Sequence, residues 1–142
     1  MNLVIDASVV LKWFFRERKG EADTEPAPTR LAGIDADRFR LLQPPHFLAE
    51  VAAVLAREKP ESARDDLADL RLIQSQTVED TATYETAIDL SIRLGHHLFD
   101  TLCHAVAFRS PDTTLLTADR KYFDKARDEG RIVLLSQFIL HS

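Results

Sequence analysis

The chain has 142 residues, a 45% hydrophobic fraction, a formal net charge of −5 and one cysteine, Cys103. This size and composition predict a single globular domain over residues 1–142 that needs no disulfide to fold. They exclude an internal disulfide, nucleic-acid binding by bulk positive charge alone and a membrane span, and without a signal-peptide pattern we expect a cytoplasmic protein.

The chain opens with a short apolar run, Leu3–Ile5, that ends at Asp6. A continuous apolar run is typical of a strand buried on both faces, as in a parallel sheet. Ligands of such sheets bind beyond the carboxyl ends of the strands, where Asp6 would lie. A turn aspartate that bonds its own backbone is the competing interpretation. A short helix over Ser8–Phe15 should follow, with Ser8 as its N-cap.

The next segment is expected to be irregular before the sheet resumes. Arg16–Pro28 is charged and proline-containing, which predicts a loop, and a brief helix over Thr29–Gly33 should follow it. Phe39–Leu42 is a second strand candidate, stopped by two prolines.

Two amphipathic helices are predicted next, over His46–Glu58 and Ser62–Gln76, with a short strand over Thr77–Glu79 after them. Glu50 lies at the edge of the apolar stripe of the first helix, about 100° around the wheel from its nearest member. At that edge a carboxylate can reach a cleft, although an ordinary boundary glutamate is the favoured interpretation when the residue is taken alone.

Two further helices are predicted over Thr83–Leu94 and His96–Arg109, the first closed by Gly95. The expected apolar face of the first comprises Ala87, Ile88, Ile92 and Leu94. Asp100 falls in the first turn of the second, where free backbone N–H groups favour a carboxylate, either for function or as a simple cap. Its helical neighbours are small or polar, which leaves room for a water-filled site: Cys103, His104 and Ala107.

The opening pattern recurs near the end of the chain, where the strand candidate Thr114–Thr117 is followed by Ala118 and Asp119. A helix or turn over Lys121–Gly130, a strand over Arg131–Leu135 and a closing segment, Phe138–Leu140, complete the chain. This order of elements predicts an α/β fold of three layers, a central mostly parallel sheet flanked by helices.

Four carboxylates, those of Asp6, Glu50, Asp100 and Asp119, therefore have a route to one edge of the sheet. Such a cluster repels itself unless cations neutralise it. Oxygen ligands without a Cys/His set select Mg²⁺ or Mn²⁺, and either ion can activate water for phosphoryl displacement. The residues thus favour a metal-dependent phosphodiesterase or nuclease.

Four segments resemble, in order, the motifs of PIN-domain ribonucleases, and among these the VapC toxins of bacterial toxin–antitoxin pairs. They are V-I-D-A-S-V at 4–9, A-E-V-A-A-V-L at 49–55, H-H-L-F-D-T-L-C-H-A-V-A at 96–107 and L-L-T-A-D-R-K-Y-F at 115–123. The resemblance covers nearly the whole chain.

The resemblance implies that Asp6, Glu50, Asp100 and Asp119 form the acidic metal site, with Ser8 and Thr117 as polar residues that support the ligands or water. It also implies endonucleolytic cleavage of RNA by a metal-activated water, leaving a 3′-hydroxyl and a 5′-phosphate. A cognate antitoxin protein and a homodimer come with it. A non-catalytic PIN-like module that binds RNA or protein stays open as the alternative.

Other chemistries fit the sequence less well. The spacing of the potential zinc ligands His96, His97, Cys103 and His104 matches no zinc pattern. Cys103 has no defined base as a nucleophile, and Ser8 is not in a nucleophile elbow. An aspartyl-phosphate enzyme would have a second aspartate in place of Ser8. A receiver-like signalling domain would need a phosphoacceptor aspartate after its middle strand and a lysine after a late strand, and this chain has neither at a convincing place. The basic residues nearest the site in the sequence are candidates for RNA contacts, and simple solvated charges are the competing interpretation. These residues are Lys12, Arg16, Arg18, Lys19, Arg120 and Lys121.

Overall fold

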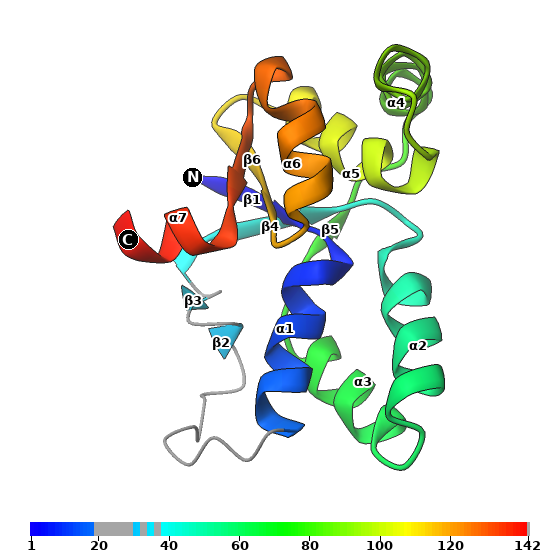
Figure 1. Cartoon of the computed structure of the whole chain (residues 1–142), viewed down its shortest axis with the longest axis vertical. Helices are drawn as coiled ribbons and strands as arrows, with labels where there is room; N and C mark the ends of the chain where they lie inside the picture. The colour runs from blue at the N-terminus through cyan, green and yellow to red at the C-terminus, as the bar shows by residue number, and fades with distance from the viewer. Residues whose placement is uncertain (19–29, 32–33, 36–37, 142) are drawn as a thin grey trace.

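The structure is a computed structural model that describes residues 1–18, 30–31, 34–35 and 38–141. Its elements follow one another along the chain as shown in Figure 1: β1 (Asn2–Ile5), α1 (Ala7–Arg18), β2 (Arg30–Leu31), β3 (Ile34–Asp35), β4 (Arg40–Gln43), α2 (Phe47–Glu58), α3 (Ala63–Arg71), β5 (Gln76–Thr77), α4 (Thr81–Leu94), α5 (Leu98–Arg109), β6 (Thr113–Thr117), α6 (Arg120–Ala126), the 3₁₀ turn η2 (Arg127–Glu129), β7 (Ile132–Leu134) and α7 (Leu135–His141).

Five strands form one sheet in the order β5-β4-β1-β6-β7, and every neighbouring pair is parallel. Within the described residues seven α-helices surround this sheet, and in Figure 1 α1, α2 and α3 lie on one side of it with α4, α5 and α6 on the other. The three-layer α/β architecture expected from the order of elements is therefore confirmed. β2 and β3 pair separately as a two-stranded antiparallel ribbon.

The central strand β1 is covered on both faces, as its continuous apolar run predicts. Val4 packs with Val106 of α5 and Tyr122 of α6, whereas Ile5 packs on the opposite face with Phe14 of α1 and Val51 of α2. Successive side chains of a strand point to opposite faces, so both faces need apolar residues when helices cover both.

Several expected boundaries are wrong. α1 begins at Ala7, so Asp6, and not Ser8, precedes its first turn. The helix predicted over Ser62–Gln76 ends at Arg71, and Gln76–Thr77 joins the sheet edge as β5.

The connection between α1 and β4 also differs from expectation where it is described. Residues 16–18 continue α1 instead of starting a loop, and the rest of the predicted loop lies outside the described residues. Within the helix expected over 29–33, Arg30–Leu31 is a strand, and the other positions lie outside the described residues. At the other end of the chain, β7 stops at Leu134 and the closing segment is helical.

Helix α4 buries only part of the apolar face expected for it: Ala87 and Leu94 pack in the core, whereas the two isoleucines do not. Ile88 and Ile92 are 48% and 77% exposed, while Ala87 and Leu90 are buried. The small Ala87 side chain lets α5 approach closely, so that Thr101 Oγ1 donates to the Ala87 carbonyl at 2.9 Å. The buried part of α4 that includes Ala87 packs against α5, where Leu102 and Ala105 lie in the same core cluster.

Ala87→Leu is expected to destabilise the protein by about 1–3 kcal/mol, because its extra carbons have no space between α4 and α5. The free energy of unfolding measured in urea checks this. Ile92→Ala, on the exposed face, should change it by no more than about 0.5 kcal/mol. An Ala87→Leu variant as stable as the native chain would contradict the close α4–α5 packing.

A search of the described residues for a helix with the length and apolarity needed to cross a bilayer finds none.

Candidate acidic site at the carboxyl edge of the sheet

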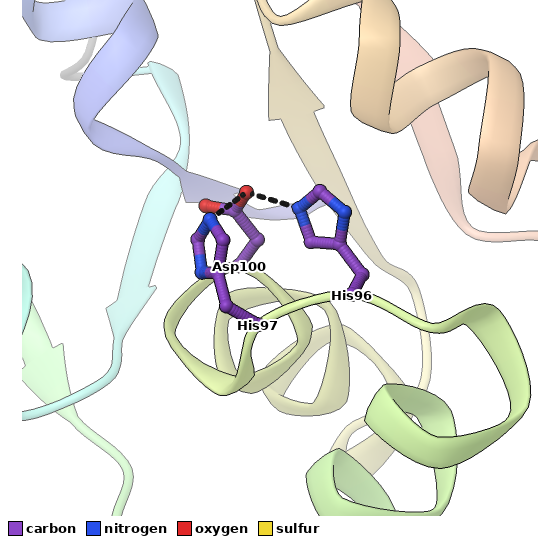
Figure 2. A group of neighbouring side chains, drawn as sticks. All are labelled: His96, His97 and Asp100. Atoms are coloured by element: carbon purple, nitrogen blue, oxygen red, sulfur yellow. Dashed lines mark hydrogen bonds and ion pairs between the residues drawn. The ribbon is translucent and has the colours of Figure 1, made fainter.

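Two of the four predicted carboxylates lie in the first turns of helices. Asp100, in α5, is 19% exposed, and its Oδ2 lies 2.7 Å from His96 Nε2 and 3.1 Å from His97 Nε2 (Figure 2). Glu50 is half-buried in α2. The pKa of Glu50 is raised by burial and then by the negative charge of Asp100, while His97 acts in the opposite direction. Glu50, Asp100 and His97 therefore lie within electrostatic reach of one another.

Asp6 occupies the single position between β1 and α1, and it is buried. Its Oδ1 accepts hydrogen bonds from the Ser8 backbone N–H, at 3.1 Å, and from the Ser8 hydroxyl. Burial raises the pKa of Asp6 to about 6; hydrogen bonds from the Ser8 and Thr117 hydroxyls hold it down, and the charge of Asp100 raises it further. An anionic Asp6 is thus costly without a compensating positive charge.

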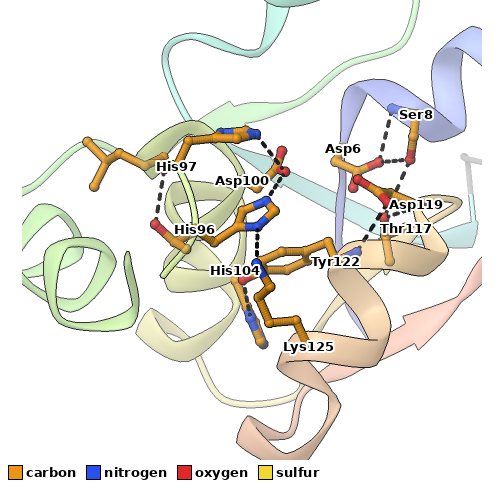
Figure 3. A network of polar contacts seen from close by, with 12 residues as sticks. Asp6, Ser8, His96, His97, Asp100, His104, Thr117, Asp119, Tyr122 and Lys125 are labelled. Atoms are coloured by element: carbon orange, nitrogen blue, oxygen red, sulfur yellow. Dashed lines mark hydrogen bonds and ion pairs between the residues drawn. The ribbon is translucent and has the colours of Figure 1, made fainter. Parts of the chain in front are cut away.

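Asp119 follows the neighbouring strand β6 and caps α6, because its Oδ1 accepts from Tyr122 N–H at 3.1 Å. Its own N–H donates to Thr117 Oγ1 at 3.0 Å. Ser8 Oγ lies 3.4 Å from Thr117 Oγ1 and accepts from Ala118 N–H at 2.9 Å. These bonds join the ends of β1 and β6, as Figure 3 shows.

Hydrogen bonds thus tie Asp6, Ser8, Thr117 and Asp119 into one network at the sheet edge. Asp100 faces this network from α5, and its charge raises the pKa of Asp6. The charge of Asp100 also raises the pKa of Glu50. No three of these four carboxylates, all in the described part of the chain, have oxygens within 4.8 Å of one another.

Ser8→Ala should raise the pKa of the Asp6 carboxyl above about 6. The variant removes the Ser8 hydroxyl, which donates a hydrogen bond to the ionised Asp6 carboxylate. Loss of such a hydrogen bond should raise the pKa of Asp6 by about one to two units. The titration of the Asp6 carboxyl carbon by NMR measures this. Ser75→Ala, at an exposed position, is the control that should leave the titration unchanged. A lowered or unchanged pKa in Ser8→Ala would contradict the network.

The sequence analysis missed the role of two histidines. His96 and His97 reach Asp100 because they precede it by four and three residues, a spacing that aligns side chains about one helical turn apart. The His96 ring also packs on Tyr122, with ring centroids 4.8 Å apart, and its Nδ1 lies 3.3 Å from Lys125 Nζ. That spacing was readable in the sequence, but only the approach of α6 brings Tyr122 and Lys125 to it.

The residues expected to leave a water-filled space beside Asp100 do not line one, because Cys103, His104 and Ala107 are all buried in the core. His104 Nδ1 lies 2.9 Å from the Tyr122 hydroxyl, and its Nε2 lies 2.8 Å from the Gly130 carbonyl oxygen. Burial lowers the pKa of His104 and raises that of the Cys103 thiol. Both are packing residues, so the four potential zinc ligands do not meet.

Three of the predicted RNA contacts have side chains that the structure describes, and all three are exposed: Lys12, Arg120 and Lys121. Arg16 and Arg18 continue α1, and Lys19 lies outside the described residues.

Comparison with known proteins gives one family match. The family model described as PIN domain matches residues 3–129. No curated protein sequence matches the chain.

Two solved structures are similar in fold. The crystal structure of PAE2754 from Pyrobaculum aerophilum is 16% identical, with a TM-score of 0.64, and the match covers 99% of this chain and 94% of that one. A toxin–antitoxin complex from Klebsiella pneumoniae is 14% identical, with a TM-score of 0.57, and covers 93% of this chain and 96% of its own matched chain.

Proposed function

This chain belongs to the PIN-domain family, and from that premise we propose that it is a metal-dependent endoribonuclease, acting in the cytoplasm as the VapC-type toxin of a toxin–antitoxin pair. PIN domains are generally metal-dependent nucleases. The observation that carries the proposal is the joined pair of strand ends, where Asp6 and Asp119 lie on adjacent strands under the electrostatic influence of Asp100.

The donor chemistry of the site fits a divalent cation. Asp6, Glu50, Asp100 and Asp119 offer carboxylate oxygens, which Mg²⁺ and Mn²⁺ accept as ligands. Burial raises the pKa of Asp6 and of Glu50, and the charge of Asp100 adds to both effects. A cation reverses this cost by stabilising the ionised carboxyl groups. When bound, Mg²⁺ or Mn²⁺ supplies Lewis acidity to a phosphate oxygen and lowers the pKa of a water molecule.

The residues of the chain would position the ligands and the substrate. Ser8 and Thr117 hold Asp6 through their hydroxyls, and the Tyr122 N–H holds Asp119. His96 holds Asp100 through a 2.7 Å contact. Because the net charge of the chain is −5, RNA phosphates would be bound by local basic side chains, with Lys12, Arg120 and Lys121 as the described candidates.

We propose an antitoxin protein and a second copy of this chain as its partners. The likeness in fold to a chain of the Klebsiella pneumoniae toxin–antitoxin complex supports the first. An antitoxin would silence the site by placing a basic side chain among the mutually repelling carboxylates. The structure of the complex tests this, and an unobstructed, metal-filled cleft in it would count against the idea.

Incubation of the purified chain with RNA tests the enzymatic proposal. Cleavage is expected with Mg²⁺ or Mn²⁺, none is expected in excess EDTA, and it should return when the metal is restored. The products should carry 5′-phosphate and 3′-hydroxyl ends. A folded chain that binds RNA or protein but cuts under no metal would overturn the proposal in favour of a non-catalytic binding module.

A further inference from the structure

Two imidazole rings converge on one carboxylate oxygen at the start of α5. His96 Nε2 and His97 Nε2 both contact Asp100 Oδ2 (Figure 2). Within the described part of the chain, these three side chains are the group of three whose potential ligand atoms all lie within 4.8 Å of one another. Nitrogen donors thus stand beside a carboxylate of the proposed metal site.

The surroundings of His96 assign it a positioning role. Lys125 Nζ lies 3.3 Å from His96 Nδ1, and an ammonium group can only donate, so Nδ1 accepts. In that tautomer the proton is on Nε2, which donates to Asp100 at 2.7 Å, a length typical of a hydrogen bond to a charged acceptor. The ring packs between His97 and Tyr122, with centroids 4.5 and 4.8 Å away. His96 therefore fixes the orientation of Asp100.

His97 differs from His96 in the exposure of its side chain and in its distance from Asp100. Its side chain is 61% exposed, so solvent and ions reach it. Its Nε2 lies 3.1 Å from Asp100 Oδ2. Two ligand atoms at right angles around an ion, each bonded at about 2.1 Å, lie about 3 Å apart. The His97–Asp100 pair already has this spacing.

We propose that His97 Nε2 is a nitrogen ligand of the metal ion, beside Asp100, and that the site takes a divalent transition ion in preference to Mg²⁺. This inference rests on the metal site of the proposed function and refines its ligand set. Imidazole suits Fe²⁺, Ni²⁺, Cu²⁺ and Zn²⁺ best, and Mn²⁺, at the low end of the same affinity series, accepts it more readily than Mg²⁺, which favours oxygen ligands and retains its waters.

Pulsed electron paramagnetic resonance of the Mn²⁺-loaded chain tests the inference without an activity assay. The native protein should show ¹⁴N modulation from a coordinated imidazole, and His97→Ala should lose it. His97→Ala should also reduce the affinity for Mn²⁺ relative to Mg²⁺ by about 10-fold or more, measured by calorimetry. Because His97 is exposed, circular dichroism of the variant should match that of the native chain.

Two matched variants distinguish an imidazole that binds the metal from one that only lies near it. His46→Ala removes an imidazole that lies against Phe99, outside the ligand group, and should keep the nitrogen signal. His96→Ala should keep the signal but weaken metal binding. Native protein that binds Mn²⁺ without nitrogen modulation, or a signal that survives His97→Ala, would overturn this inference and leave the proposed function standing. A native chain that binds no divalent ion would overturn both.

Discussion

Asp100→Asn is expected to lower metal-dependent RNA cleavage by at least about 100-fold while the fold is retained. Loss of an outer partner of a metal ligand already costs 10–100-fold, so loss of a charged ligand should cost more. Asp100 has the widest electrostatic reach of the four carboxylates, since its charge raises the pKa of both Asp6 and Glu50. Asparagine keeps the shape of the side chain and an oxygen that accepts from His96 Nε2.

Initial rates of RNA cleavage at saturating Mn²⁺ measure the effect of Asp100→Asn, with circular dichroism and thermal unfolding to verify the fold. Asp69→Asn, an equal change of charge at an exposed position of α3, is the matched control and should cleave at the native rate. Comparable activity in Asp100→Asn and the native chain would show that the acidic edge is not the catalytic site.

The second large effect concerns stability, and Asp6→Asn should increase it. The pKa of Asp6 is about 6 in the folded chain against 3.8 for the free side chain, so between these pH values the folded state binds more protons than the unfolded state. Stability therefore falls as the pH rises through this window. Asparagine has no charge to bury, and at pH 7 the variant should be more stable by up to about 3 kcal/mol.

Urea unfolding at pH 4, 5, 6 and 7 in EDTA measures the difference between Asp6→Asn and the native chain. The difference should grow from pH 4 to pH 6 and then level off, with unchanged urea dependence. The pKa values of His46 and His104 are lowered in the folded chain, which makes stability rise with pH, opposite to the effect of Asp6. Both histidines are present in the variant and in the native chain, so their effect cancels in the difference. An Asp6→Asn chain that is less stable than native at every pH would refute the argument. Asp69→Asn should show no such trend.

Gain in stability together with loss of activity is the pattern of a functional site. A buried carboxylate is retained at a cost to the fold when its charge is needed for binding or chemistry. Asp6→Asn would thus separate the two roles of one residue, because the ionised form that a metal requires is the form that the folded chain disfavours.

Local sequence determined the strands and the acidic positions after them. Leu3–Ile5 is apolar without alternation, and the structure buries it between two layers of helices, as a parallel strand requires. Asp6 and Asp119 directly follow apolar runs, so their place at one edge followed once both strands were expected to be parallel. The fold class and the candidate carboxylates were predictable because these signals lie within a few residues of each other.

Tertiary structure alone decided which surfaces meet. β1 lies beside β6, and this pairing brings Ser8 to Thr117 across more than a hundred residues of chain. Helix α4 buried Ala87 and left Ile92 in solvent, since close packing on α5 outweighed the larger apolar side chain. Lys125 reaches His96 only because α6 packs beside α5. Contacts of this kind depend on the balance of packing over the whole core, which no local pattern of residues encodes.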